Sequence, residues 1–242
     1  IQTNFNKAAK KYEDNSEIQK LSAVKLAEIC SQKPIKKGIW ADLGSGTGLL
    51  AESLELLHPN QAVLRIDNSI NMISQQPQQR LTNIWDLNHG LPELSEPPQL
   101  LASNFVLHWL LEPNLQLQQW LETLAKGGWI ALSLPIQGSF PEWHQATTSA
   151  GVPLTALDLY SPQELLKGFT VQQIRYNNQI KLTQTASSLQ TLFKPIAKSG
   201  AQTTQSPSLS IGQWRRLKKA WPKNKGDRFS LTWLIQMVLI QK

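Results

Sequence analysis

The chain has 242 residues, of which 40% are hydrophobic and 17% are charged, and its formal net charge is +7. This length is enough for one sizeable core, and no apolar run approaches the roughly 18 to 20 residues that span a bilayer. The single cysteine, Cys30, excludes an internal disulfide and a cysteine-rich zinc site, and the polar N-terminus lacks the apolar core of a signal peptide. We therefore expect a cytoplasmic, globular, monomeric protein without a membrane segment.

Predicted strands and helices alternate between residues 36 and 135. Strands are expected at 36–43, 62–67, 82–86, 99–105 and 129–135, and helices at 16–32, 46–57, 69–77 and 115–124. The helices carry apolar residues at helical spacing, and Ser69 is placed to cap the third of them. This alternation is typical of a parallel sheet covered by helices.

The pattern loosens after Pro135. Helices are expected at 161–169, 188–200 and 208–221, and strands at 170–182 and 229–240. Ser161 is placed to cap the first of these helices, and Pro195 is expected to end or kink the second. Because this region is longer than a simple crossover needs, we interpret it as a mostly helical cap, at about 136–225, inserted in a single domain of residues 1–242.

The positive charge is concentrated near the C-terminus. Between residues 212 and 228 there is one acid, Asp227, and there are seven basic residues: Arg215, Arg216, Lys218, Lys219, Lys223, Lys225 and Arg228. The segment predicts either a docking face for an acidic partner or a solvent-facing helix followed by a lysine-rich loop.

Four polar residues fall at the ends of successive predicted strands: Asp42, Asp67, Asp86 and Asn104. The carboxyl ends of parallel strands meet at one edge of a sheet, and ligands bind there in open α/β sheets. These side chains are therefore expected to surround one ligand.

The turn after the first strand reads Asp42-Leu-Gly-Ser-Gly-Thr-Gly48, one residue shorter than a dinucleotide fingerprint. A carboxylate at position 42 would repel a pyrophosphate, but it would suit a cationic ligand such as S-adenosylmethionine. Asp67, nineteen residues after Gly48, is placed to accept hydrogen bonds from the ribose hydroxyls, and Asp86 to meet the adenine amino group. A nicotinamide dehydrogenase, or a glycine turn without a ligand, is the alternative.

This set of residues resembles the class I S-adenosylmethionine-dependent methyltransferases, and residues 124–135 are similar to the segment that leads into their fifth strand. The resemblance implies an α/β, Rossmann-like fold, with a mainly parallel seven-stranded sheet and an antiparallel last strand. It also implies that residues 1–35 form an N-terminal lid and helix. It also implies a cofactor, S-adenosyl-L-methionine, and the following cofactor-binding residues: Tyr12, Asp42, Gly44, Ser45, Gly46, Asp67, Asn68, Asp86, Leu87, Ser103, Asn104 and His108.

The sequence on either side of these motifs resembles that of the malonyl-[acyl-carrier-protein] O-methyltransferases of biotin synthesis. The similar segments are 5–20 (FNKAAKKYEDNSEIQK), 103–109 (SNFVLHW), 137–146 (QGSFPEWHQA) and 231–242 (LTWLIQMVLIQK). The chain departs from that family where residues 97–103 lack the usual Phe-Asp, where His108 replaces a frequent glutamine, and where Ser45 and Thr47 replace common Cys and Pro.

The second resemblance implies methyl transfer to the free carboxylate of malonyl-acyl carrier protein. That carboxylate is ionised near pH 7, so neither a general base nor a metal is expected. Tyr12, Trp109, Ser139 and His144 are the implied substrate residues, with core or surface packing as the alternative for each. Lys10, Lys194 and Arg175 are candidate partners of the carboxylate, or else solvated cations.

The implied partner is an acidic acyl carrier protein, for which 212–228 is a candidate docking face. A methyltransferase for another small carboxylic acid, such as an aconitate-type substrate, is the first alternative. A nucleic-acid methyltransferase is disfavoured, because the fourth strand does not end in the Asn/Asp-Pro-Pro-aromatic signature of enzymes that methylate base amino groups. A non-catalytic binding protein is the third alternative.

Overall fold

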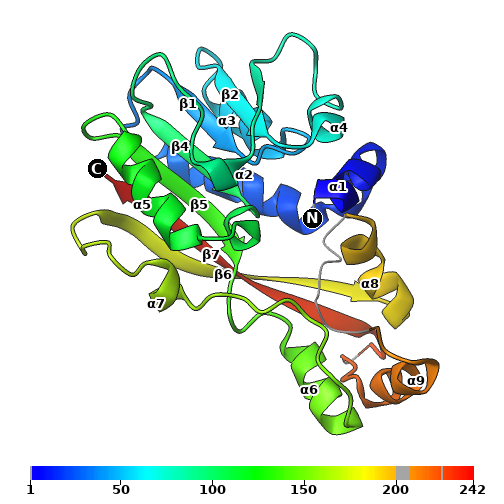
Figure 1. The fold of residues 1–242 in the computed structure, drawn as a ribbon. Coiled ribbons are helices and arrows are strands. Elements are labelled where there is room, and N and C mark those ends of the chain that lie inside the picture. The colour runs from blue at the N-terminus through cyan, green and yellow to red at the C-terminus, as the bar shows by residue number, and fades with distance from the viewer. Residues whose placement is uncertain (1, 200–207, 225) are drawn as a thin grey trace.

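Seven strands form one sheet in the order β3-β2-β1-β4-β5-β7-β6 (Figure 1). The structure is a computed structural model that describes residues 2–199, 208–224 and 226–242. The strands are β1 (Trp40–Leu43), β2 (Val63–Asp67), β3 (Thr82–Ile84), β4 (Leu100–Asn104), β5 (Trp129–Pro135), β6 (Ile174–Ala186) and β7 (Phe229–Gln241).

Strands β1 to β5 pair in parallel, and β7 runs antiparallel to both β5 and β6. The predicted sheet, mainly parallel with an antiparallel last strand, is confirmed. The strand order turns back at β1, whose two neighbours are β2 and β4. Such a switch point opens a crevice at the carboxyl edge, and this is where a ligand is expected.

The helices cover both faces of the sheet (Figure 1). They are α1 (Gln2–Ala8), α2 (Glu17–Ser31), α3 (Leu49–Leu57), α4 (Ile70–Ile73), α5 (Pro113–Thr123), α6 (Pro141–Ala150), α7 (Pro162–Leu165), α8 (Leu189–Lys198) and α9 (Ile211–Ala220). Alternate residues of the strands point to opposite faces. Leu100 of β4 thus packs in the cluster formed with α2 and α3, whereas Leu101 packs in the cluster formed with α5.

Local sequence signals explain several helix ends. The Ser69 hydroxyl accepts a hydrogen bond from Met72 N–H at the start of α4, as predicted. Ser161 and Glu164 form a complete capping box at the start of α7. The prediction for Pro195 was wrong as to the end of the helix, because α8 continues past it to Lys198.

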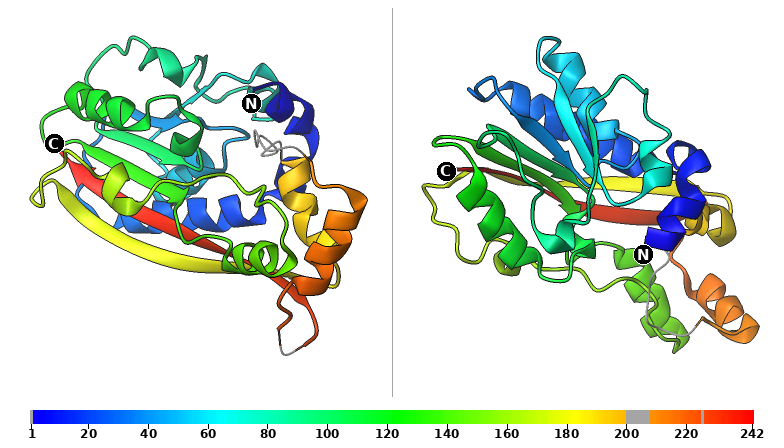
Figure 2. Two further views of the ribbon diagram at one scale, coloured as in Figure 1. Left: turned by 60° about the horizontal axis from the view of Figure 1, so that its bottom comes forward. Right: turned by 45° about the horizontal axis from the view of Figure 1, so that its top comes forward.

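The region between β5 and β7 contains both cap helices and a sheet strand. Helices α6, α8 and α9 gather near one end of β6 and β7, where α6 packs against α9 and against β7, and α8 packs against both strands (Figure 2). Between them in sequence, β6 pairs with β7 along the main sheet, so the range 136–225 is not all cap. Its division from the rest of the domain stays a prediction. None of the described helices is long and apolar enough to cross a membrane.

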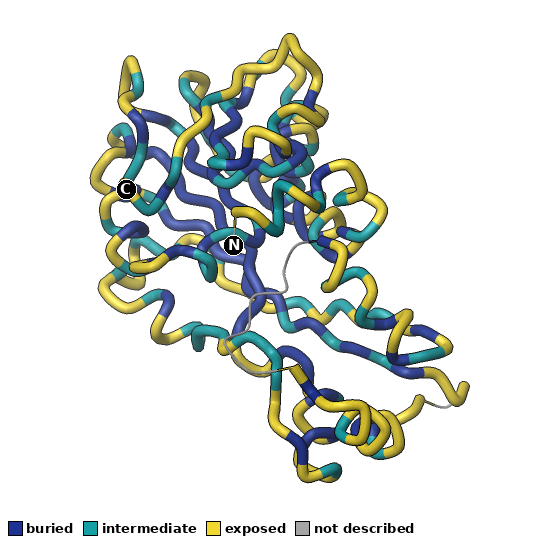
Figure 3. Tube along the Cα trace, turned by 45° about the vertical axis from the view of Figure 1, so that its right-hand side comes forward, coloured by how far each residue is buried: buried dark blue, intermediate teal, exposed yellow. Residues whose placement is uncertain are grey.

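Burial follows this arrangement. The buried positions run along the central strands, and the outer turns of the helices are exposed (Figure 3). The N-terminal segment contacts α4 on one side, through α1, and α8 on the other, through the short 3-10 helix Glu13–Asn15. The carboxyl edge of the sheet is therefore bordered by elements from both ends of the chain.

Candidate active site

The glycine loop joins β1 to α3 and closes tightly against β2. The backbone N–H groups of Gly44 and Ser45 both donate to the Ile66 carbonyl, at 2.7 and 3.0 Å. Gly44 and Gly46 have positive φ angles of 72° and 54°. A Cβ atom on Gly44 would overlap the side chain of Val106, so this position needs glycine for space as well as for conformation.

Asp67, the last residue of β2, holds the loop from the neighbouring strand. Its Oδ2 accepts a hydrogen bond from Gly46 N–H, and its Oδ1 accepts one from Ser69 N–H, each at 2.8 Å. Burial raises the pKa of Asp67, and the two backbone donors act in the opposite direction. The carboxylate is thereby held at the carboxyl edge of the sheet.

A cavity of about 250 Å³, which we call the loop cavity, lies against the glycine loop. Nine of the predicted cofactor and substrate residues line it: Tyr12, Gly44, Gly46, Asp67, Asn68, Asp86, Leu87, Asn104 and Trp109. The structure thus brings together residues that are up to 97 positions apart in the sequence.

The donor and acceptor groups of this cavity fit a nucleoside with a polar tail. Glycine backbone lies at one end, and the carboxylates of Asp67 and Asp86 follow at the ends of β2 and β3, with the Trp85 ring beside them. Both hydrogen bonds of Asp86 go from Asn88 to its Oδ1, at 2.9 and 3.0 Å. Within the described parts of the chain, no three His, Cys, Asp or Glu side chains gather in a way that could hold a metal ion.

Asp42 lies behind the loop and does not line the loop cavity. Its side chain is 1% exposed, and Oδ2 accepts a hydrogen bond from Ala51 N–H, in the first turn of α3, at 3.1 Å. Burial raises the pKa of Asp42 to about 7, against the opposing effects of that N–H and of Arg65. Its contact with the cofactor stays a prediction; here it ties β1 to α3.

The replacement Asp42→Asn is expected to stabilise the protein above pH 7 and to change little near pH 4. Because the folded-state pKa is raised from 3.8 to about 7, wild-type stability falls as the pH rises through that interval. The neutral amide avoids the loss, which has an upper bound on the order of 4 kcal/mol. Urea unfolding at pH 4.5 and pH 8 measures the difference in the free energy of unfolding between the variant and the wild type. An equal difference at the two pH values would contradict the prediction.

Ser45 and Ser103 also face protein rather than cavity. The Ser45 hydroxyl accepts a hydrogen bond from Gln76 Nε2 at 3.2 Å, and the Ser103 hydroxyl donates to the Leu43 carbonyl at 2.9 Å. Both side chains are buried. They support the loop and the junction of β1 with β4, and their predicted cofactor contacts stay predictions.

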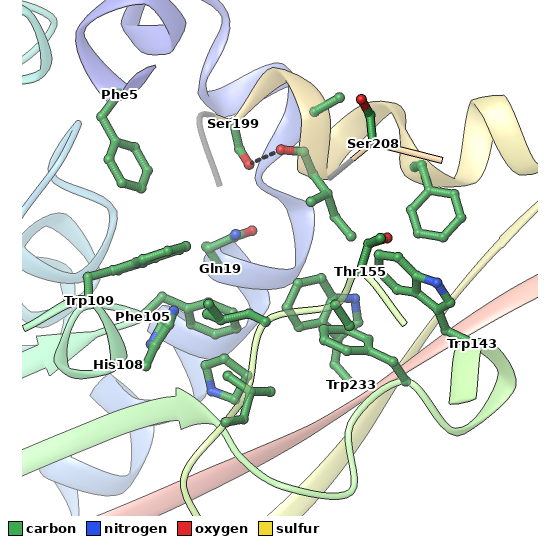
Figure 4. Close-up of a pocket in the computed structure, with 18 of the residues that line it drawn as sticks. Phe5, Gln19, Phe105, His108, Trp109, Trp143, Thr155, Ser199, Ser208 and Trp233 are labelled. Carbon is green, nitrogen blue, oxygen red and sulfur yellow. Dashed lines mark hydrogen bonds between the residues drawn. The ribbon is translucent and has the colours of Figure 1, made fainter. Parts of the chain in front are cut away.

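A second cavity, of about 470 Å³, lies between the carboxyl edge of the sheet and the cap helices, and we call it the cap cavity (Figure 4). Four side chains line both cavities: Phe5, Tyr12, Phe105 and Trp109. The ring of Phe5 meets that of Trp109 edge-on, with centroids 5.9 Å apart. The two cavities thus adjoin across one aromatic wall.

His108 lines the cap cavity rather than the loop cavity, so the structure places it away from the other predicted cofactor residues. Burial lowers the pKa of His108 to about 3, so the imidazole is neutral at physiological pH. Its Nδ1 is buried and has no hydrogen-bond partner among the described residues.

Ser139 and His144 line neither cavity. The Ser139 hydroxyl donates to the carbonyl of Leu234 and accepts from its N–H, at 3.1 and 3.0 Å, so its hydrogen bonds tie the chain to β7. His144 is exposed on α6, whereas the adjacent Trp143 points inward and lines the cap cavity. These positions do not favour the predicted substrate contacts.

Phe105 and Phe140, which sequence reasoning missed, are cavity residues with unusual backbone conformation. Both have positive φ, 59° and 62°, and both line the cap cavity. Non-glycine residues rarely adopt this region, and they cluster at functional sites when they do. Nothing in the local sequence marks a phenylalanine for positive φ, so only the structure could reveal them.

Gln76 is a second residue that the sequence did not indicate. Its Nε2 donates to the Gly46 carbonyl at 2.7 Å and to the Ser45 hydroxyl at 3.2 Å. The side chain is buried, 6% exposed, although it lies beyond the end of α4. Gln76 is therefore a positioning residue for the glycine loop.

Two kinds of methyltransferase have sequences similar to this chain. No family model matches the chain. The trans-aconitate 2-methyltransferase of Deinococcus radiodurans is 37% identical over 95 residues, which cover 39% of this chain and 36% of that protein. The malonyl-[acyl-carrier protein] O-methyltransferase of Salmonella typhimurium is 23% identical over 98% of this chain and 95% of its own length.

Solved structures share the fold. A Bacillus halodurans protein described as a methyltransferase superposes with a TM-score of 0.60 at 14% identity, covering 90% of this chain and 98% of its own. This likeness shows that the chain has the Rossmann-like fold of these methyltransferases. The plantazolicin methyltransferase BpumL, solved with S-adenosylhomocysteine, superposes with a TM-score of 0.54 at 14% identity over 98% of this chain and 89% of its own.

Proposed function

We propose that this methyltransferase esterifies the free carboxylate of a malonyl group carried by an acyl carrier protein. The observation that carries the proposal is the pair of adjoining cavities, one bounded by the glycine loop and the other by the cap. The Salmonella typhimurium relative supports the malonyl acceptor because its likeness extends along 98% of the chain. The Deinococcus radiodurans relative, similar over the shorter stretch, favours trans-aconitate as the second candidate.

The loop cavity is the proposed cofactor site. Asp67 would accept from the ribose hydroxyls and Asp86 from the adenine amino group, while the Gly44–Gly46 backbone would lie along the methionine part. When bound there, S-adenosylmethionine would supply an electrophilic methyl group for one carboxylate oxygen, with its methyl carbon–sulfur bond breaking to leave a neutral thioether.

The remaining work of the protein is positioning and exclusion of water. A malonyl carboxylate is ionised near pH 7, so no residue has to remove a proton. The wall formed by Phe5, Tyr12, Phe105 and Trp109 borders both cavities and would exclude water from the junction. Holding an acceptor in line with a bound methyl group contributes about 7 to 11 kcal/mol in favourable cases.

Helix α9 is the proposed docking face for the carrier protein. Trp214 lines the cap cavity and is 39% exposed, so α9 forms part of the rim. Arg215, Lys218 and Lys219 are exposed on the same helix, and none of them forms an ion pair with a described residue. Lys223 pairs with Asp227 at 2.7 Å, and Lys225 lies outside the described residues.

The deciding experiment measures methyl transfer from labelled S-adenosylmethionine to malonyl-acyl carrier protein, with succinyl-carrier protein, free malonate, trans-aconitate and tRNA in parallel. Label in a base-labile ester on the malonyl carrier is the expected result. Label that appears only on trans-aconitate would replace the proposal with the second candidate. Label on tRNA would show that the methyl acceptor is a nucleic acid and would contradict a carboxylate acceptor.

Charge reversal on α9 tests the docking face. The triple replacement of Arg215, Lys218 and Lys219 by Glu is expected to raise KM for malonyl-carrier protein about tenfold at low salt, because complementary charge governs encounter. The malonyl thioester of N-acetylcysteamine, which has no acidic carrier, should keep its KM.

Lys36→Glu with Lys37→Glu is the control, because both residues are exposed in the loop that precedes β1, at the opposite edge of the sheet. Equal losses on the carrier-bound and the small thioester would contradict docking on α9.

A further inference from the structure

None of the described residues that line the cap cavity has an Asp, Glu, Lys or Arg side chain. Ten of the residues around it are aromatic: Phe5, Tyr12, Phe105, His108, Trp109, Phe140, Trp143, Phe193, Trp214 and Trp233. The other described lining residues are aliphatic, or carry a hydroxyl or an amide.

The titratable groups of this lining are neutral near pH 7. Burial lowers the pKa of His108 to about 3, and burial together with the charge of Asp67 raises the pKa of Tyr12. The charge that acts on Tyr12 is therefore the negative one of Asp67. A carboxylate in the cap cavity therefore meets hydrogen-bond donors and no described cation.

The three cations that the sequence offered as partners of the acceptor carboxylate lie elsewhere. Lys10, Lys194 and Arg175 are exposed and are not among the residues that line the cap cavity. The Arg175 guanidinium donates instead to the Gln241 side chain at 3.1 Å, on the outer strands of the sheet. Neutral donors, chiefly the Gln19 amide and the Tyr12 hydroxyl, are left to meet the carboxylate.

We propose that the cap cavity accepts a single terminal carboxylate on an uncharged body, and that it rejects acceptors carrying further carboxylates. This rests on the proposed function in one respect, namely that the acceptor occupies the cap cavity. Each additional buried carboxylate needs a cation or several donors, and without them the loss of its hydration opposes binding. An aromatic lining instead favours a thioester or amide body.

The size of the cavity agrees with such a body. A volume of about 470 Å³ lies within the roughly 300 to 1,000 Å³ of pockets that hold drug-sized molecules. A malonyl group alone is much smaller, so the uncharged arm that carries it also has room. Trp214 lines the cavity and is 39% exposed, so the part of the cavity wall that α9 supplies reaches the surface of the proposed docking face.

Selectivity among acceptors of different charge is the first test. We expect kcat/KM for the malonyl thioester of N-acetylcysteamine, with one negative charge, to exceed that for free malonate or trans-aconitate at least about 100-fold. Values within tenfold of one another would overturn the proposal.

The Gln19 side chain offers a variant that changes the charge of the lining. It projects from α2 into the middle of the cap cavity (Figure 4). Gln19→Lys adds a cation there. We expect it to lower the ratio of kcat/KM for the malonyl thioester to kcat/KM for trans-aconitate at least about tenfold. Gln19→Met has a similar length and adds no charge, but it removes the amide donor; both kcat/KM values should therefore fall, while their ratio should change much less than in Gln19→Lys. Equal ratios in both variants would contradict the proposal.

Binding measurements separate this inference from the proposed function. With S-adenosylhomocysteine present, quenching of tryptophan fluorescence reports on acceptors, because four tryptophans line the cap cavity. If malonyl thioesters are not methylated but glutaryl or adipoyl thioesters bind far more tightly than trans-aconitate, the malonyl proposal fails and the charge selectivity stands. Tight binding of trans-aconitate overturns the selectivity. If Gln19→Lys does not fold, Thr155→Lys, on the opposite wall, replaces it.

Discussion

The replacement Asp67→Asn is expected to weaken binding of S-adenosylmethionine about 30- to 150-fold. Both carboxylate oxygens of Asp67 accept backbone N–H groups, from Gly46 and from Ser69, at 2.8 Å. An asparagine has one acceptor oxygen, so its amide NH₂ must face one of these donors and displace the glycine loop or the start of α4. The charged acceptor for the ribose is lost as well. Together these changes cost about 2–3 kcal/mol of binding free energy.

The matched control is Asp86→Asn, because it makes the same chemical change in the same cavity. Both hydrogen bonds to Asp86 end on Oδ1, so an asparagine can keep them with its single oxygen. We expect a loss of less than about tenfold for this variant. Isothermal titration calorimetry with S-adenosylhomocysteine measures both, and circular dichroism checks that they fold. Equal losses of affinity in the two variants would show that the hydrogen bond between Gly46 N–H and Asp67 does not contribute to cofactor binding.

Loss of the Glu55 carboxylate is expected to destabilise the protein by about 3–5 kcal/mol. Arg65, in the middle of β2, is fully buried, and its two terminal nitrogens donate to the two Glu55 oxygens at 3.0 and 2.8 Å. Burial acts to raise the pKa of Glu55, but the contacts with Arg65 and Arg80 outweigh it and lower the pKa. Glu55→Ala would leave the Arg65 guanidinium buried without its anion.

Arg80→Ala serves as the control for that variant. Arg80 also reaches Glu55, at 3.0 Å, but its side chain is 39% exposed. Exposed ion pairs contribute about 0–1 kcal/mol, so a small change is expected. Urea unfolding measures both free energies. A loss below about 1 kcal/mol for Glu55→Ala would mean that water or another acceptor reaches Arg65. The double variant Glu55→Ala/Arg65→Met should recover part of the loss.

Most of the fold could be predicted because its signals are local. The apolar run of β5 marks a buried strand, and the strand is found at Trp129–Pro135 as predicted. Serine caps at positions 69 and 161 mark helix starts by a hydrogen bond that spans three residues. The strand 170–182 was also expected, but its place in the main sheet depends on pairing with β7, more than 40 residues away.

The candidate site was predictable where strand ends carry it. Asp67, Asp86 and Asn104 follow from the rule that parallel strands end at one edge, and all three line the loop cavity. Ser139 and His144 rested on resemblance of a short segment alone. Which way such side chains point depends on what packs beside them, and the structure turns the first to β7 and the second to solvent.

The sequence by itself determined the glycine loop and the order of strands and helices, because turns, caps and periodicity act over a few neighbouring residues. Tertiary structure alone decided that Asp42 faces α3 rather than the loop cavity, and that Gln76 holds the loop. It also decided that the described residues lining the cap cavity are uncharged and come from both ends of the chain, from Phe5 to Trp233. A cavity forms where segments distant in the sequence pack together, and local sequence patterns do not predict which segments those are.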